Sequence, residues 1–231
     1  MQISNNTETL DFLDQVKTYF QTEKTLYGED LYLDYDFQNL LRSESEKKRD
    51  VLLKLFFHVK ECRNCDLAKS RKKFVFGSGN PSSRIMLIGE APGANEDLQG
   101  KPFVGEAGKL LDKILAAIKL TRNDIFLTNI LKCRPPQNRD PLPDEVVACE
   151  SILLKQIEIL KPEFILIVGR IAAHYLLKTT APLRELRGKV VDVFNAKAIV
   201  TYHPSALLRE PGLKRSAWED VQLFQKLYEQ G

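Results

Sequence analysis

Residues 84–93 read RIMLIGEAPG, and this stretch decides the fold. An apolar run without polar alternation is typical of a strand that is buried on both faces of a sheet. The proline and glycine that follow it mark a tight turn. Later runs of the same kind lie at residues 125–130, 164–169 and 198–202. Together with residues 84–89, they predict four short buried strands.

The segments between these runs carry apolar residues at helical spacing. Two helix faces are predicted, one from Leu110, Leu111, Ile114, Leu115 and Ile118, the other from Val146, Val147, Leu153, Leu154 and Ile157. A closing helix is predicted at residues 216–228. Buried strands that alternate with helices indicate a parallel sheet covered on both faces. We therefore expect a three-layer α/β/α sandwich with a central, mostly parallel four-stranded sheet.

The first fifty residues differ in charge from the rest of the chain. They contain 6 Lys/Arg and 11 Asp/Glu, whereas residues 51–231 contain 28 and 20. A helix near the start is predicted from Leu10, Leu13, Val16 and Phe20, and residues 27–35 read as acidic, aromatic and irregular. We predict an acidic, helical extension at residues 1–50 and a basic domain at residues 51–231. A basic domain suits a polyanionic partner, although many proteins of this charge bind no nucleic acid.

The four cysteines suggest a metal site. No run approaches the roughly 20 apolar residues that a membrane span needs. The N-terminus has neither the basic start nor the apolar core of a secretory signal, so we expect a cytoplasmic protein with reduced thiols. Cys62 and Cys65 form a C-x2-C pair, whereas fifteen residues separate Cys133 from Cys149. Zinc sites usually pair two short knuckles, and thiolates from separate elements are compatible with an iron–sulfur cluster. Spacing alone leaves both metals open.

The segments after the predicted strands carry the candidate chemistry, because ligands of open α/β sheets bind outside the carboxyl ends of the strands. These segments read GEAPGANED (89–97), TNILKCRPP (128–136), GRIAAH (169–174) and YHPSALLR (202–209). Three of them are rich in polar residues, glycine and proline, and the third is plainer. We expect the functional site at this edge of the sheet.

These motifs, with PFVG at 102–105, NRDP at 138–141 and the cysteine pattern, resemble the family 4 uracil-DNA glycosylases, the iron–sulfur branch of that superfamily. The resemblance covers residues 55–229. It implies an enzyme that flips uracil out of DNA and hydrolyses its N-glycosidic bond, leaving an abasic site in the repair of deaminated cytosine. It also implies one 4Fe-4S cluster, with Cys62, Cys65, Cys133 and Cys149 as ligands.

The resemblance assigns base-binding roles to Glu90, Ala91, Phe103, Asn129 and His203. Backbone N–H groups in the turn at Glu90 can bind a uracil carbonyl. Phe103 stacks on the flipped base, and its polar, glycine-rich surroundings argue against deep burial. The Asn129 amide fits O4 and N3–H of uracil and opposes the pattern of cytosine. His203 lies against uracil O2 and stabilises the departing anion.

The residue that activates water is less clearly marked. Ala91 stands where the best-known branch of the superfamily has an aspartate for this task, so we propose Glu96, with a contribution from Glu90, beside the catalytic His203. A sister branch stays bound to its product through a histidine in a basic insertion. Residues 132–149 contain neither, so we expect turnover and no lyase step.

The loop after the fourth strand is the candidate DNA contact. By resemblance it enters the duplex with Leu207 and Leu208 as an apolar wedge. Further candidate DNA contacts are Arg134, Arg139, Ser205 and Arg209, together with the run Arg71-Lys72-Lys73. The expected substrate is uracil-containing DNA, single- or double-stranded, bound by a monomer without a membrane partner.

Two other functions fit parts of the sequence. One is a zinc-bearing α/β hydrolase or nucleotide-processing enzyme, which would contain zinc and excise no uracil. The other is a non-catalytic DNA-binding or polymerase-associated module, which would bind DNA without releasing a base. The presence of Phe103, Asn129 and His203 argues against the second.

Overall fold

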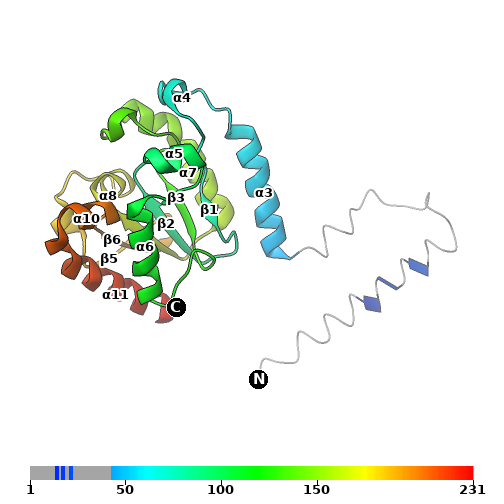
Figure 1. The fold of residues 1–231 in the computed structure, drawn as a ribbon. Helices are drawn as coiled ribbons and strands as arrows, with labels where there is room; N and C mark the ends of the chain where they lie inside the picture. The colour runs from blue at the N-terminus through cyan, green and yellow to red at the C-terminus, as the bar shows by residue number, and fades with distance from the viewer. Residues whose placement is uncertain (1–13, 16, 19–20, 23–42, 231) are drawn as a thin grey trace. The chain divides into compact units, whose positions relative to one another are not determined.

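The computed structural model describes residues 14–15, 17–18, 21–22 and 43–230 (Figure 1). The chain divides into two units, residues 1–43 and 44–231. In the first unit residues 14–15, 17–18 and 21–22 are helical, and the Thr18 hydroxyl donates to the Asp14 carbonyl over 2.8 Å. The apolar positions that predicted a helix there, and the stretch 27–35, lie outside the described residues. The predicted boundary at residue 50 stays a prediction.

The second unit alternates strands and helices. Its strands are β1 (Ser78–Gly79), β2 (Ile85–Gly89), β3 (Phe126–Asn129), β4 (Phe164–Val168), β5 (Val190–Val193) and β6 (Ala196–Thr201). Its α-helices are α3 (Glu44–Val59), α4 (Leu67–Ser70), α5 (Ala94–Gln99), α6 (Glu106–Ala117), α7 (Pro143–Leu160), α8 (Arg170–Leu176), α9 (Leu183–Leu186), α10 (Pro204–Arg209) and α11 (Lys214–Gln230). Short 3-10 helices lie at η1 (Pro136–Asn138) and η2 (Pro211–Leu213).

All six strands form one sheet in the order β1-β3-β2-β4-β6-β5. The inner four strands pair in parallel, and the two edge strands pair antiparallel with their neighbours. The chain places β3 on one side of β2 and β4 on the other. The order therefore reverses at β2, which is where ligand crevices form in open α/β sheets.

The predicted strands are confirmed as β2, β3, β4 and β6, but the predicted count of four is wrong. Strand β1 contains only two residues, too few to leave a periodic pattern. Strand β5 is half-exposed along its length, so it lacks the continuous apolar run of a buried strand. Both missed strands lie at the edges of the sheet, and the three-layer fold is unchanged.

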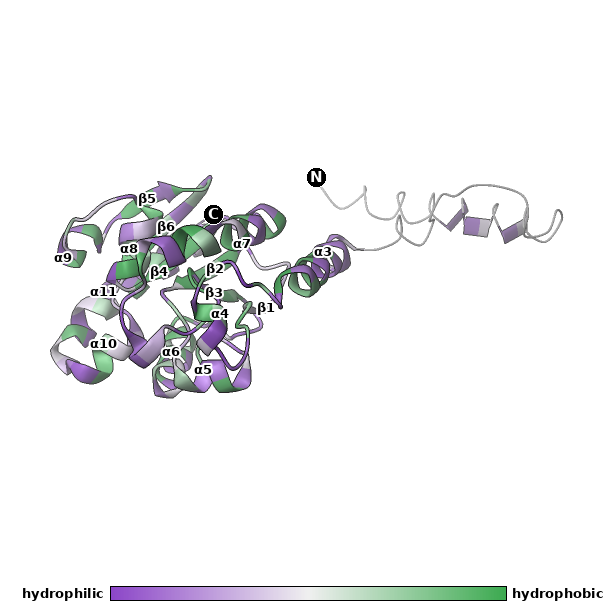
Figure 2. Cartoon of the chain, turned by 90° about the horizontal axis from the view of Figure 1, so that it is seen from above, coloured by the Kyte–Doolittle hydropathy of each residue, from purple (hydrophilic) through white to green (hydrophobic). Residues whose placement is uncertain are grey.

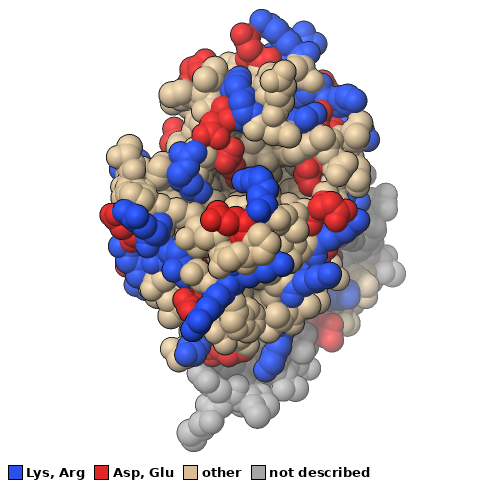
Figure 3. All heavy atoms as spheres, turned by 60° about the vertical axis from the view of Figure 1, so that its left-hand side comes forward, with Lys and Arg blue, Asp and Glu red and all other residues tan. Residues whose placement is uncertain are grey.

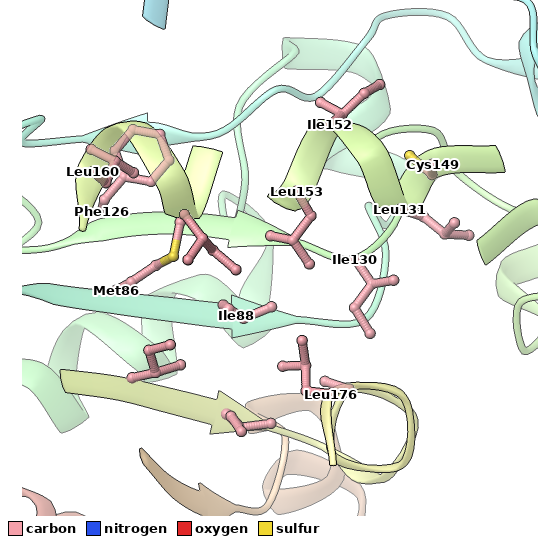
Figure 4. Packing of buried hydrophobic residues seen from close by; sticks show 14 of the residues in the cluster. Met86, Ile88, Phe126, Ile130, Leu131, Cys149, Ile152, Leu153, Leu160 and Leu176 are labelled. Carbon is pink, nitrogen blue, oxygen red and sulfur yellow. The ribbon is translucent and has the colours of Figure 1, made fainter. Parts of the chain in front are cut away.

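Two apolar clusters sandwich the sheet, because successive residues of a strand point to opposite faces. Met86 and Ile88 of β2 belong to one cluster, with side chains from α3, α7 and α8 (Figure 4). Ile85 and Leu87 belong to the other, with side chains from α6 and α11. Figure 2 shows strand β2 as hydrophobic and helix α5 as mostly hydrophilic. The layered architecture is therefore α/β/α, as expected.

Helix α7 buries a narrower face than predicted. Leu153 and Ile157 are buried, whereas Val147 and Leu154, predicted for the same face, are 69% and 38% exposed. Residues one position apart on a helix lie about 100° apart, so adjacent leucines cannot both face the sheet.

Among the described residues, no helix combines the length and apolar character that a membrane crossing requires.

The adjacent leucines of α7 provide a matched test of this packing. We expect Leu153→Ala to lower the free energy of unfolding by about 2–5 kcal/mol, because it leaves a cavity against the sheet. Leu154→Ala removes the same atoms from a partly exposed position and should cost less than about 1 kcal/mol. Urea denaturation of both variants measures the difference. Equal losses would contradict the assigned helix face.

Candidate active site

A cavity of about 480 Å³ opens at the carboxyl ends of the parallel strands. Each of the four strand-end segments lines it, with Glu90, Asn129, Gly169 and His203. Its volume lies within the range of small-molecule sites. The plainer segment after β4 thus contributes to the site as well, through Gly169 and Arg170.

Gly89, the last residue of β2, lets two side chains approach the sheet. A Cβ atom at this position would lie 2.5 Å from Asn129 Oδ1 and 2.7 Å from Phe103 Cζ. Real Cβ atoms essentially never come this close to a non-bonded atom, so a side chain at this position would displace Asn129 and Phe103. Gly89 is not among the predicted site residues. A glycine at the end of a buried strand is the signal that could have found it.

Asn129 brings an unsatisfied acceptor to the cavity. Its side chain is 2% exposed, and its Oδ1 atom has no hydrogen-bond partner. A buried acceptor without a partner costs free energy, so such atoms are rare outside functional sites. The amide is therefore arranged to meet a donor on a bound molecule.

Phe103 also lines the cavity, but its side chain is only 5% exposed. The expectation that it avoids deep burial is therefore wrong, because its ring packs beside the His203 ring, with centroids 5.9 Å apart at 29°. Its backbone has a φ of +53°, which is uncommon for a bulky residue. Arg122 donates to the Phe103 carbonyl and stabilises this conformation.

Glu96 supports the same loop. Its Oε1 accepts the backbone N–H groups of Val104 and Gly105 over 2.7 and 2.8 Å. Its other oxygen lies beside Gly93, where an added Cβ would approach it to 2.7 Å. Glu96 therefore lines the cavity and at the same time holds the loop that follows Phe103.

His203 is set in one orientation by the start of helix α10. Its Nδ1 accepts the backbone N–H of Ser205 over 3.1 Å and lies 2.8 Å from the Ser205 hydroxyl. Because Nδ1 is an acceptor, the proton of the neutral ring belongs on Nε2. Burial, assisted by the Arg209 charge, lowers the pKa of His203 from 6.5 to about 4. The ring is therefore a neutral donor near pH 7.

Glu90 is the second titratable group in the cavity. Burial raises the pKa of its carboxyl to about 7, and the nearby Asp140 carboxylate adds to the rise. Arg170 and Arg209 oppose it, and Arg170 itself is paired with Asp140 over 2.8 Å. A carboxyl that titrates near neutral pH is suited to proton transfer. Ala91 lies beside it in the cavity wall.

The predicted DNA contacts divide into accessible and buried residues. Leu208 is 46% exposed, whereas Leu207 is 2% exposed and packs inside the domain. The prediction that Leu207 forms part of the wedge is therefore wrong, because the helical turn of α10 directs its side chain inward. Arg209 lines the cavity and is exposed, and Ser205 lies against His203.

Two predicted phosphate contacts are engaged in ion pairs or hydrogen bonds. Arg139 donates to both carboxylate oxygens of the buried Glu145, over 2.8 and 2.5 Å. Arg134 donates to Asn138 over 2.8 Å and is partly exposed. The face in Figure 3 shows basic and acidic side chains intermixed.

The four cysteines lie on three segments beside the same core cluster. Cys62 and Cys65 are half-buried and precede α4, Cys133 follows β3, and Cys149 belongs to α7; all four are free thiols. Burial raises the pKa of Cys133 to about 11, and Cys65 and Cys149 add to the rise. Cys149 is affected similarly by Cys62 and Cys65, so the thiols act on one another across the three segments.

Arg71 lies within this cysteine group. Its guanidinium donates to the Cys62 carbonyl over 2.7 Å and to the Cys133 sulfur over 3.3 Å. The prediction of Arg71 as a phosphate contact is therefore wrong, because its side chain turns inward to the cysteines. Within residues 43–230, no three or more His, Cys, Asp or Glu side chains are arranged to hold a single metal ion. The donor set of four thiols is the set used by iron–sulfur clusters and by structural zinc.

Comparison with known proteins supplies the family. A model described as "Uracil DNA glycosylase superfamily" matches residues 76–225. The curated "Type-4 uracil-DNA glycosylase" of Archaeoglobus fulgidus is 43% identical over 74% of this chain and 88% of its own length. The chain belongs to the type-4 uracil-DNA glycosylases. The type-4 protein of Saccharolobus solfataricus is 46% identical, and the match covers 74% of this chain and 82% of that protein. The type-4 protein of Thermotoga maritima is 40% identical, and the match covers 71% of this chain and 88% of that protein.

In this type-4 glycosylase the neutral His203 can be tested directly. We expect the ring to titrate near pH 4 in an NMR pH series, with the remaining proton on Nε2. Because the unfolded chain takes up this proton near pH 6.5, the free energy of unfolding should fall as pH drops from 6.5 toward 4. A midpoint at or above 6.5 would contradict the assigned burial.

Proposed function

We propose that this chain is a uracil-DNA glycosylase that reads a flipped uracil with Asn129 and releases it by hydrolysis. The observation that carries the proposal is the unpartnered Oδ1 atom of Asn129, buried in a cavity at the strand ends. The relatives named type-4 uracil-DNA glycosylases support it. A base cannot be reached inside duplex DNA, so the nucleotide must leave the stack to enter this cavity.

The Asn129 amide selects uracil by the placement of one acceptor and one donor. Oδ1 accepts from uracil N3–H, and Nδ2 donates to O4. Cytosine presents an acceptor at N3 and a donor at position 4, so both contacts would become repulsive. A buried site with fixed polar groups rejects the wrong partner strongly. Phe103, beside Asn129 over Gly89, supplies the surface on which the base stacks.

His203 assists the departure of the base. Its neutral ring presents Nε2–H, and we place this donor at uracil O2. Negative charge grows on the base as the glycosidic bond breaks, so the hydrogen bond strengthens in the transition state. A neutral donor stabilises this charge without holding the product as an ion pair.

Glu90 and Glu96 are the groups proposed to orient the attacking water. Glu90 is partly ionised near pH 7 because of its raised pKa, and it can accept a proton from water. Glu96 uses Oε1 to hold the loop after Phe103, which leaves Oε2 for water at the edge of the cavity. The product is an abasic site, and no lyase step is proposed.

DNA binding is proposed to centre on the loop of α10. The exposed Leu208 enters the space left by the flipped nucleotide, and Arg209 contacts the backbone beside it. Arg134 is a further proposed phosphate contact. We propose uracil-containing DNA, single- or double-stranded, as the substrate of a monomeric enzyme.

We further propose that Cys62, Cys65, Cys133 and Cys149 hold one 4Fe-4S cluster. The four free thiols and the Arg71 hydrogen bond to Cys133 fit such a site, because hydrogen bonds to ligand sulfurs are common around clusters. Bonds to iron would tie three chain segments together. The proposed role is architectural, because Cys133 lies four residues from Asn129, and no redox step is needed for hydrolysis.

Uracil release tests the function. The purified chain should convert an oligonucleotide with one uracil to an alkali-labile product, with breaks only at uracil. Gly89→Ala should slow release by about 100-fold or more, because it displaces Asn129 and Phe103. The matched control Gly212→Ala adds a Cβ where no atom lies within 4 Å and should leave the rate unchanged. DNA binding without release, or release unaffected by Gly89→Ala, would contradict the proposal.

Metal analysis tests the cluster. Anaerobically purified protein should be brown and contain about four iron and four sulfide per chain. Cys133→Ser should lower the iron content and bleach the visible absorption. Stoichiometric zinc without iron would contradict the cluster and favour the zinc alternative.

A further inference from the structure

Lys132 is a fully buried lysine between the uracil-reading strand end and helix α7. Its relative exposure is 0%, and its ammonium group reaches three oxygen atoms. Nζ donates to the Thr128 hydroxyl over 2.6 Å, to the Asn129 carbonyl over 2.7 Å and to Gln156 Oε1 over 2.7 Å. The charged form of the amine has three N–H donors, which match these three acceptors in number.

Each polar side-chain atom of Lys132, Thr128 and Gln156 has a hydrogen-bond partner. The Thr128 hydroxyl lies 3.1 Å from the Phe76 carbonyl and donates to it, and Gln156 Nε2 donates to the same oxygen over 2.8 Å. Thr128 and Gln156 are themselves fully buried. Buried hydrogen bonds that share partners in this way hold the side chains in one arrangement.

The topology of the sheet explains why Asn129 needs this donor. Ile130 donates to the Gly89 carbonyl, so the carbonyl of the preceding Asn129 points away from β2, toward the β1 side. Strand β1 runs antiparallel to β3 and begins at Ser78, opposite Leu127, so its pairing does not reach Asn129. Among the described residues no strand pairs with Asn129 on this side, and Lys132 Nζ supplies the hydrogen bond that a β1 starting earlier would have made.

Lys132 also connects this carbonyl to the cysteine-bearing helix. Gln156, which accepts from Lys132 Nζ, belongs to α7, the helix that also contains Cys149. The Lys132 carbonyl accepts from Val75 N–H over 2.8 Å. One residue thus joins β3, helix α7 and the segment that precedes β1.

We propose that Lys132 is a positioning residue that fixes the peptide of Asn129 and so holds its amide in the orientation that reads uracil. The inference rests on the proposed function. Lys132 does not touch the base, because it lies on the β1 side of β3 and is absent from the cavity wall. It acts on catalysis through Asn129 alone.

A double-mutant cycle tests this role, with single-turnover uracil release from the full chain as the measurement. Lys132→Met should slow release by about 10-fold or more, because the Asn129 carbonyl loses the donor that Lys132 Nζ supplies. Asn129→Ala removes the reading amide. The double variant should be no slower than Asn129→Ala, since Lys132 has nothing left to position. Losses that multiply, or a Lys132→Met variant as fast as the wild type, would overturn the proposal.

Gln156→Leu is the matched control for general damage to the network. It removes one contact of Lys132 but keeps the one to Asn129, so uracil release should fall less than in Lys132→Met at equal folded fraction and iron content. An equal loss would show that core disruption is the cause and would contradict the proposal. If Lys132→Met does not fold, Lys132→Gln, whose shorter side chain draws its amide donors back from the Asn129 carbonyl, replaces it in the same cycle with the same expected results. Wild-type protein that releases no uracil contradicts the proposed function itself, which separates the two failures.

Discussion

Parallel pairing of β2 with β3 on one side and β4 on the other is the interaction on which the site depends. Gly89 lies in register with Asn129, and Ile130 and Leu131 donate to the carbonyls of Gly89 and Glu90, so the pairing continues past the strand ends. Because all inner strands run in one direction, Glu90, Asn129, Gly169 and His203 emerge at a single edge. The missing Cβ of Gly89 then brings the amide of Asn129 and the ring of Phe103 together over that edge. The helices on both faces supply the apolar burial that holds this register.

The buried polar groups on the β1 side of β3 are hydrogen-bonded, whereas Asn129 in the cavity has an acceptor without a partner. On the β1 side, Lys132 Nζ donates to three oxygen atoms, which makes the strand end rigid. Burial raises the pKa of Glu90 and lowers that of His203, so both groups are driven toward their neutral forms. A cavity that disfavours charge at rest makes each hydrogen bond to a developing anion stronger than it would be in water.

Much of this arrangement could be predicted from the sequence, because buried parallel strands leave continuous apolar runs and their ends carry polar motifs. Strands β1 and β5 could not, since one is too short and the other too exposed for a pattern. The direction in which individual side chains point could not be predicted from the sequence either. Leu207 and Leu208 are adjacent in one motif, yet the turn of α10 buries the first and exposes the second. Arg71 resembles a surface charge until the fold places its guanidinium against Cys62 and Cys133.

We propose that the unpartnered Oδ1 of Asn129 reads uracil. A crystal structure of the chain with a cleaved, uracil-containing oligonucleotide tests it most directly. We expect the released base in the cavity, stacked on Phe103, with N3 about 2.7–3.2 Å from Asn129 Oδ1. A base bound outside the cavity, or one inside it that leaves Oδ1 without a donor, would show that Asn129 does not read uracil.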